Sequence, residues 1–232
     1  FQASVAPPFA DPDRATEADL TVAFGHSYDT ADHAVAVTPA ATAFQIAREL
    51  GSAADPILAL AGTIAGGNAD GTVADAAEQA GLERRPGLAI PVSDLADGLA
   101  HSTLLSGPFS GDPDAARAAL ADSGPDADDG RRAASLVALA VTEDAPVRAT
   151  EAVARGLHPY VGGPFETVGG YADVLDAVAR EDPGTAAALA IGADVHDAAL
   201  DAWRAHAEAV HAALRSATIG RYDGLTVVRS DD

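Results

Sequence analysis

The sequence predicts an α/β protein that is rich in helices and carries its strands near the N-terminus. Three observations lead to this prediction. Short apolar runs at 20–24 and 34–37 have the length of buried parallel strands. From residue 39 onward the pattern is mostly helical, with marked helix starts and stops. The chain has 232 residues, 48% of them hydrophobic, which is ample material for a core.

The strand-like runs come first along the chain, at 1–5, 20–24 and 34–37, and one more follows at 225–229. Helix starts are marked where a capping residue precedes a proline that can occupy the first helical position. These pairs are Thr38-Pro39, Asp55-Pro56, Asp112-Pro113 and Asp182-Pro183, and the expected C-terminal stops are Gly51, Gly81 and Gly192. The helices are expected at 39–50, 56–65, 72–80, 93–101, 113–122, 130–143, 146–157, 168–181, 183–191 and 194–216.

The charge balance predicts a salt-adapted protein, and the lack of a membrane span or signal segment leads us to expect it in the cytoplasm. There are 35 acidic and 14 basic residues, a formal net charge of −21, and every basic residue is arginine. In ordinary buffer such a charge opposes compaction, whereas at molar salt the screening length falls to about 3 Å. The alternative is an acidic chain that binds a basic partner. No apolar run approaches the roughly 20 residues of a membrane span, and no signal segment opens the chain.

The polar loop at 25–33 is the candidate metal site. Because the chain has no cysteine, a metal would need carboxylate or imidazole ligands. His26, Asp29, Asp32 and His33 fall within eight positions directly after a strand-like run. Such ligands suit Mn²⁺ or Mg²⁺, and a metal-activated water is what phosphodiester hydrolysis requires. The alternative is an ordinary polar loop of an acidic chain.

The candidate binding residues are Arg131, Arg132 and His158. The only arginine doublets are 84–85 and 131–132. His158 opens a Gly/Pro-rich segment, 158–164, which is either a binding loop or a turn between packed helices.

The histidines outside the 25–33 loop, His158 included, also have structural explanations. His101 and His158 fall at expected helix ends, where they would bond terminal carbonyls. His196, His206 and His211 lie on the last expected helix and are expected at its surface. A spacing of five separates His206 from His211 by about 140° around a helix, which disfavours a metal pair.

Several segments taken together resemble one family. Residues 18–25, the triplet Asp32-His33-Ala34 and the stretches 41–51, 58–65 and 165–175 occur in the order seen in the archaeal RecJ-like branch of the DHH phosphoesterases. The resemblance implies a DHH-type α/β domain with a parallel sheet over 1–120, its first motif missing, and a helical connector over 121–220. Residues 221–232 would start a second domain, and sequence is expected to be missing from both ends.

Members of this family are single-strand-specific 5′→3′ exonucleases that use two Mn²⁺ or Mg²⁺ ions, or replication proteins that bind the GINS complex. The resemblance places Phe24, Ala34 and Gly66 where the family has metal ligands. Two-metal hydrolysis depends on carboxylates that bridge the two ions. The catalytic residues of this chain are therefore unknown, and we expect it to be a binding protein rather than an enzyme.

The leading hypothesis is therefore a catalytically degraded RecJ-like protein of DNA replication or repair that binds single-stranded DNA or a GINS-type partner. One alternative is an active Mn/Mg-dependent exonuclease built on Asp29, Asp32, His33 and His26. The other is an unrelated α/β protein of halophile metabolism.

Overall fold

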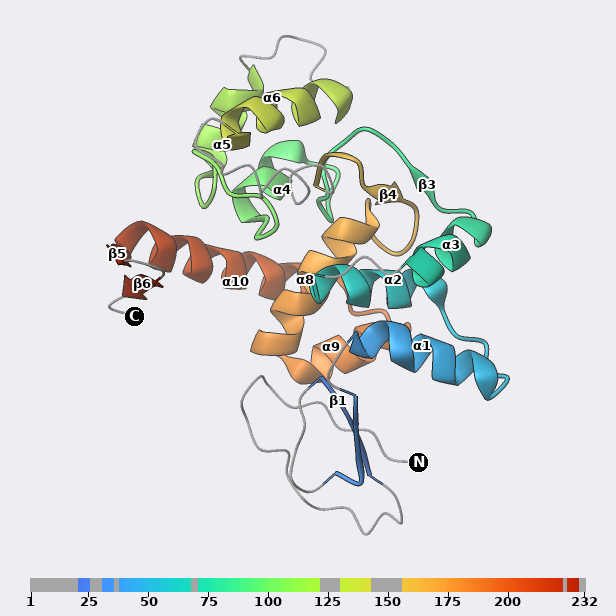
Figure 1. The fold of residues 1–232 in the computed structure, drawn as a ribbon. Helices are drawn as coiled ribbons and strands as arrows, with labels where there is room; N and C mark the ends of the chain where they lie inside the picture. The colour runs from blue at the N-terminus through green and yellow to red at the C-terminus, as the bar shows by residue number, and fades with distance from the viewer. Residues whose placement is uncertain are drawn as a thin grey trace.

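The computed structural model describes residues 21–25, 31–35, 38–67, 71–121, 130–142, 156–222 and 225–229. The helices are α1 (Pro39–Glu49), α2 (Pro56–Ala65), α3 (Gly71–Gln79), α4 (Leu95–His101), α5 (Pro113–Ala121), α6 (Gly130–Thr142), α8 (Val168–Glu181), α9 (Pro183–Ala190) and α10 (His196–Ser216), as Figure 1 shows. The strands are β1 (Val22–Phe24), β2 (His33–Val35), β3 (Glu83–Arg84), β4 (Tyr160–Val161), β5 (Thr218–Tyr222) and β6 (Leu225–Arg229).

The helix-rich prediction is confirmed, since the boundaries of these helices differ from the expected ones by at most two residues. Most of the expected helix at 146–157, like the strand-like run at 1–5, lies outside the described residues. Within the described ranges, no helix has both the length and the apolar character needed to cross a membrane.

Local capping explains most of this agreement. The carboxylates of Asp55, Asp112 and Asp182 each accept hydrogen bonds from the first N–H groups of the following helix, for example Ile57 N–H at 2.8 Å. Thr38 is the exception, and its predicted role is wrong. Side-chain capping uses an extended capping residue, whereas Thr38 is left-handed with φ 45° and forms no capping bond.

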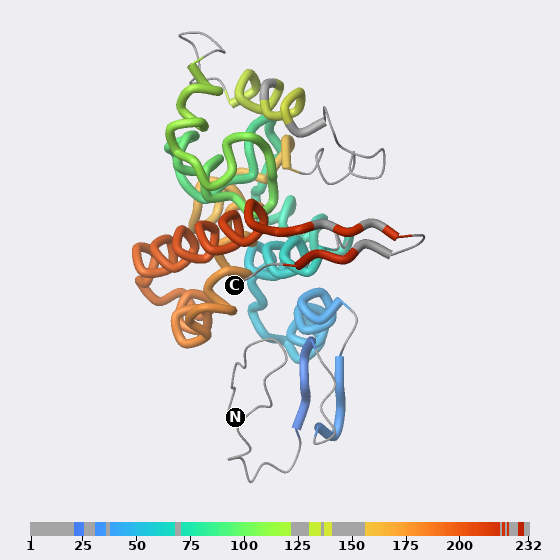
Figure 2. The backbone as a smooth tube through the Cα atoms, turned by 90° about the vertical axis from the view of Figure 1, so that its left-hand side faces the viewer, coloured from blue at the N-terminus to red at the C-terminus, as the bar shows by residue number. Residues whose placement is uncertain are grey.

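The sheets of the described residues are all two-stranded. β1 and β2 form a parallel pair in which Val22 faces His33 and Phe24 faces Val35, as expected for this part of the chain. The strand-like run at 225–229, where a second domain was expected to start, forms β6. It pairs antiparallel with β5, in a stretch expected to belong to the helical connector. Figure 2 shows this hairpin projecting past the end of α10.

Two apolar cores hold the helices together. The larger joins α1–α3 to α8–α10 around Leu60, Val174 and Trp203, with α8 packed between α2 and α10. The smaller joins α4–α6 and contains Leu99 and Phe109. Each core contains residues from both sides of position 120. The packing of the described helices therefore shows no division at this position, and the domain boundary expected there stays a prediction.

Candidate functional site

The predicted metal loop is described only in part. His26 and Asp29 lie outside the described residues. Asp32 and His33 are exposed, and an Asp32 carboxylate oxygen accepts the N–H of Thr21 at 2.8 Å. Across the described stretches, no three His, Asp or Glu side chains approach closely enough to share a metal ion. The metal assignment therefore stays a prediction.

The positions where the family resemblance would require metal ligands hold side chains without oxygen or nitrogen. Phe24 ends β1 with 47% of its surface exposed, and Ala34 pairs with Ala23 in β2. Gly66 ends α2, where its N–H donates to the carbonyl of Gly62 at 3.1 Å. These backbone positions offer no bridging carboxylate.

A different site is built on an antiparallel ribbon that was not expected from the sequence. Arg84 pairs with Tyr160, and the N–H of Arg85 donates to the Pro159 carbonyl at 3.1 Å. The N–H of Gly87 donates to the carbonyl of Leu157, also at 3.1 Å. The ribbon therefore runs beyond the two short strands and places His158 beside the first arginine doublet.

The start of α6 lies against the end of this ribbon. A methyl group built on Gly130 would lie 3.5 Å from Gly87 Cα and 3.6 Å from the Pro86 carbonyl oxygen. Arg131 and Arg132, the next two residues of α6, therefore start beside the ribbon. The fold thus brings the backbone segments that carry both arginine doublets and His158 next to one another. These five exposed residues are called the arginine cluster below: Arg84, Arg85, Arg131, Arg132 and His158.

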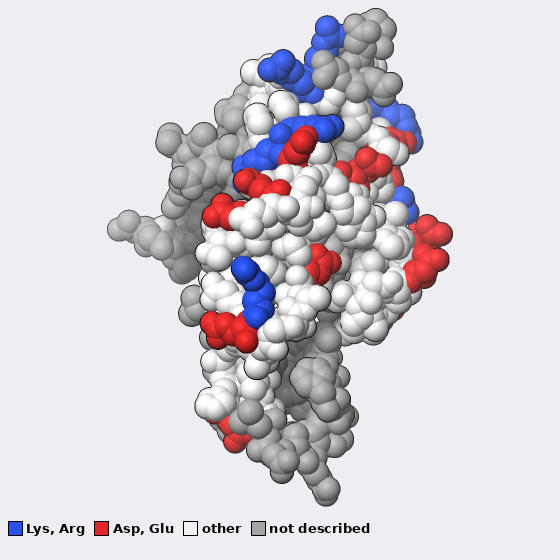
Figure 3. Space-filling view, turned by 90° about the vertical axis from the view of Figure 1, so that its right-hand side faces the viewer, with Lys and Arg blue, Asp and Glu red and all other residues white. Residues whose placement is uncertain are grey.

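The first doublet is held by neighbouring side chains. The Arg84 guanidinium lies 4.5 Å from the centre of the Tyr160 ring, and the Tyr160 hydroxyl donates to Glu78 at 2.8 Å. Burial raises the pKa of Tyr160, so the phenol stays neutral. Arg85 pairs with Glu83 at 2.9 Å on the exposed surface. Most basic side chains on the face in Figure 3 lie in its upper half, and acidic ones are spread around it.

Beside the ribbon lies an open pocket of about 950 Å³. Glu83 and Arg85 contribute from the ribbon, and His196 contributes from the first turn of α10. The other lining residues are Gly81, Pro91, Val92, Ser93, Val161, Gly162, Gly163, Pro164, Phe165, Glu166 and Leu200. The segment at 158–164, for which a binding loop and a turn were both considered, thus forms one strand of the ribbon and one wall of this pocket.

The two glycines of that wall explain its shape. Gly162 and Gly163 have φ angles of 106° and 105°, a region that favours glycine. A methyl group on Gly162 would lie 3.0 Å from Leu82, and one on Gly163 would lie 3.1 Å from Ile57. The loop therefore packs tightly against the core on one side.

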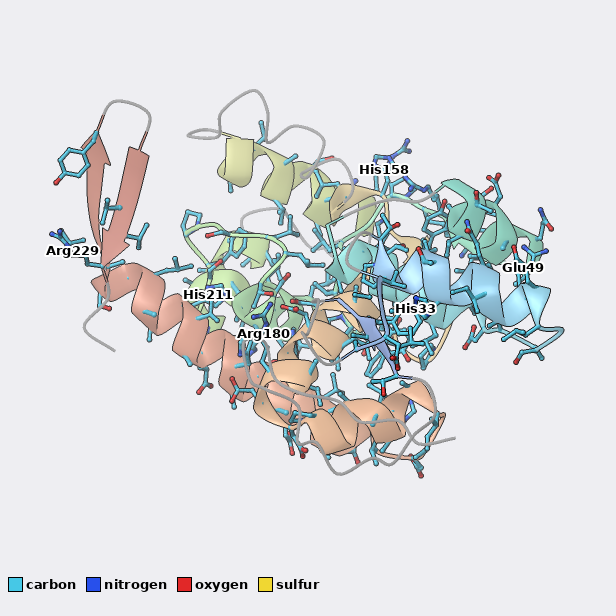
Figure 4. All side chains as sticks on the ribbon, turned by 60° about the horizontal axis from the view of Figure 1, so that its bottom comes forward. His33, Glu49, His158, Arg180, His211 and Arg229 are labelled. Carbon is cyan, nitrogen blue, oxygen red and sulfur yellow. The ribbon has the colours of Figure 1, made fainter. Side chains whose placement is uncertain are left out.

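The fold does not bring the two predicted groups of site residues together. In Figure 1, β1 lies at the lower end of the view, whereas β3 and β4 lie in its upper half. His33 and His158 are accordingly found on different parts of the molecule (Figure 4). The arginine cluster and the pocket form the candidate functional site, because they share Arg85.

Three histidines outside this site, His101, His206 and His211, have structural roles. His101 contacts the Asp97 carbonyl oxygen at 3.0 Å, which confirms its expected bond to a carbonyl near a helix end. His206 pairs with Glu181 at 2.8 Å. His211 was expected on the surface, and that is wrong. It is buried where α10 passes the α4–α5 segment (Figure 4), because this face of α10 packs against the end of α4.

His211 predicts a loss of stability in mild acid. Its Nε2 lies 3.1 Å from the Ser102 carbonyl oxygen, and burial lowers its pKa below the ordinary 6.5, with Arg215 and His101 adding positive charge nearby. As the pH drops below 6.5, His211 therefore becomes protonated in the unfolded chain but stays neutral in the folded protein. The free energy of unfolding falls over this range. Denaturation of wild type and His211→Gln in concentrated KCl tests this: the glutamine variant should lose less stability between pH 7 and 5. Equal losses would contradict it.

Comparisons with known proteins give one informative similarity. The chain is 65% identical over 238 residues to the "Uncharacterized protein rrnAC1427" of Haloarcula marismortui, and the match covers 100% of this chain and 64% of that protein. The chain thus spans less than two thirds of its relative's length. This homologue comes from a halophilic archaeon, which supports the prediction of a salt-adapted chain. No family model matches the chain. No solved structure matches it either.

Proposed function

We propose that this chain belongs to a RecJ-like, DHH-family protein of DNA replication or repair that binds single-stranded DNA in the cytoplasm without hydrolysing it. The observation that carries the proposal is that the ribbon with Arg84, Arg85 and His158 lies against the start of α6, which carries Arg131 and Arg132. A chain of net charge −21 has only 14 arginines, and the fold places the two segments that carry four of them side by side.

Direct contact is what makes such a cluster useful in concentrated salt. At molar ionic strength the screening length is about 3 Å, so charges act only on groups that they touch. Arginine binds phosphate oxygens through paired N–H groups, which gives a charge-assisted contact of defined geometry. A phosphate backbone presents acceptors at regular intervals, and a group of exposed guanidinium groups is matched to it.

The replaced ligand positions favour binding over hydrolysis. Phe24, Ala34 and Gly66 supply no carboxylate to bridge two metal ions. Mn²⁺ or Mg²⁺ would belong to this protein only if it were active, and Asp32 and His33 would then have to hold it together with residues outside the described ranges.

The first test measures DNA binding by the full chain in multimolar KCl, with a fluorescent oligothymidylate and anisotropy as the readout. Replacing the cluster arginines together, Arg84→Gln, Arg85→Gln, Arg131→Gln and Arg132→Gln, should weaken binding at least tenfold. This estimate assigns a few tenths of a kcal/mol or more to each contact in high salt. The matched control removes four exposed arginines elsewhere, Arg48, Arg117, Arg180 and Arg229, and should change affinity less than twofold.

Equal effects of the two sets would remove the arginine cluster from the proposal. Absence of DNA binding by the wild type would overturn DNA binding altogether and leave a GINS-type partner as the hypothesis to examine. The same preparation, incubated with 5′-labelled single-stranded DNA and Mn²⁺ or Mg²⁺, should leave the DNA intact. Degradation that disappears in Asp32→Ala would instead establish the exonuclease.

A further inference from the structure

We infer that the pocket beside the ribbon holds one unstacked nucleotide of the strand whose phosphates lie on the arginine cluster. This inference rests on the proposed function and names the part of the ligand that the pocket recognises. Its geometric basis is Arg85, which belongs to the cluster and also lines the pocket. A phosphate bound at Arg85 would therefore leave its own nucleoside at the pocket mouth.

The lining matches the mixed chemistry of a nucleotide. Val92, Val161 and Leu200 offer apolar surface, and the His196 ring, packed 5.2 Å from the Phe165 ring, offers an aromatic face. Aromatic and apolar faces of this kind are what bases stack on in single-strand binding proteins.

The polar groups of the pocket suit the edges of a base and its sugar. Ser93 can donate and accept hydrogen bonds, and the carboxylates of Glu83 and Glu166 accept them. A volume of about 950 Å³ lies within the range of about 300–1,000 Å³ found for small-molecule sites. The opening toward solvent leaves a path for the rest of the strand.

Concentrated salt gives a reason for such a pocket to exist. The gain from releasing counterions on phosphate contact shrinks as salt rises, so arginines alone bind weakly at molar KCl. Burial of a base's apolar face does not depend on screening, and excluded salts strengthen burial in general. A single-strand binder in this solvent therefore draws more of its affinity from bases than from phosphates.

The experiment scans a single abasic position along an oligothymidylate and measures the affinity of the full chain in multimolar KCl. For the wild type, the abasic site should cost about tenfold at one position of the strand, the value of one stacked base. Ser93→Trp fills the pocket from an exposed rim position and should cost a similar factor, and it should abolish the further loss from the abasic site. Ser106→Trp, an exposed serine outside the pocket, is the matched control and should bind as wild type.

The outcomes separate this inference from the proposed function. If the cluster variant loses DNA binding while the abasic scan is flat and Ser93→Trp binds normally, the pocket is not a nucleotide site but the proposed function stands. In a second outcome, the abasic site weakens binding to the wild type but not to Ser93→Trp, while the cluster variant binds as wild type. This outcome would support the pocket as a nucleotide site and would exclude the arginine cluster as the phosphate site. If the wild type binds neither the strand nor saturating thymidine monophosphate, the inference is overturned together with DNA binding.

Discussion

Gly170→Ala should destabilise the protein by about 3 kcal/mol, although alanine is the better helix former by about 1 kcal/mol. Gly170 lies in the first turn of α8, where the chain at 90–91 crosses the helix. A methyl group there would lie 2.1 Å from both the Ile90 carbonyl carbon and the Pro91 nitrogen. These are backbone atoms, so no side-chain rotation relieves the overlap. Chemical denaturation in concentrated KCl measures the loss.

Hydrogen bonds also fix the chain at 90–91 against the first turn of α8, so this crossing can shift little. The Thr167 hydroxyl donates to the Ile90 carbonyl at 2.8 Å and accepts the Gly170 N–H at 2.9 Å. Gly71→Ala is the control, because a methyl group at this first residue of α3 meets nothing within 4 Å. That variant should be neutral or stabilised by up to about 1 kcal/mol. A Gly170→Ala protein as stable as wild type would show that the crossing is looser than the structure has it.

The crossing also bears on the candidate site, since Pro91 is a pocket wall residue. If Gly170→Ala folds with the chain at Pro91 displaced, the proposed binding of a nucleotide in the pocket should weaken more than the proposed phosphate contacts of the arginine cluster. The same helix start thus sets both the packing of α8 and the shape of the pocket.

The sequence predicted what depends on neighbours along the chain. Asp55 before Pro56 and Gly51 after α1 act within one helical turn, so their residue types alone indicate where helices begin and end. The parallel strands β1 and β2 were likewise foreseen from their apolar runs. Thr38 shows the limit, because its left-handed backbone is not visible in its residue type.

The candidate site depends on contacts between distant residues, and the sequence carried little sign of it. Arg84 and Arg131 were recognised as members of doublets, but the proximity of their segments follows from Gly130 packing on Gly87. β3 and β4 are two residues long and have no alternating pattern. In the sequence, Gly170 is a residue that weakens a helix. Its role as the small residue against which the backbone at Ile90 packs is visible only in the fold. The sequence alone could predict a surface rich in arginine, but it could not predict where on the fold that surface lies.

Asp173→Ala should cost about 3–5 kcal/mol, a large effect for a single polar side chain. Asp173 is 1% exposed, and one of its carboxylate oxygens accepts the Trp203 Nε1–H at 3.0 Å and the Thr103 N–H at 3.1 Å. The other accepts the Thr103 hydroxyl. Alanine would leave these buried donors unpaired beside a cavity. Asp176→Ala, in the same helix but in an exposed pair with Arg180, should cost less than about 1 kcal/mol.

Asp173→Asn separates the hydrogen bonds of this site from its charge. The amide oxygen can accept the Trp203 Nε1–H and the Thr103 N–H, and the amide N–H can donate to the Thr103 hydroxyl, so the cost should stay near 1 kcal/mol. Burial raises the pKa of Asp173 above its usual 3.8. Between 3.8 and the raised value the folded protein holds a proton that the unfolded chain has lost, so the carboxyl's contribution to stability falls as pH rises through this window.

The stability of wild type relative to Asp173→Asn should therefore be greatest in acid and should decline toward neutral pH. Denaturation midpoints measured at several pH values in constant KCl give the answer. A constant gap between wild type and Asp173→Asn would mean that the buried carboxyl titrates normally. In that case its three donors stabilise the carboxylate enough to offset burial, and the charged Asp173 side chain links α8 to α10 and to the segment that follows α4.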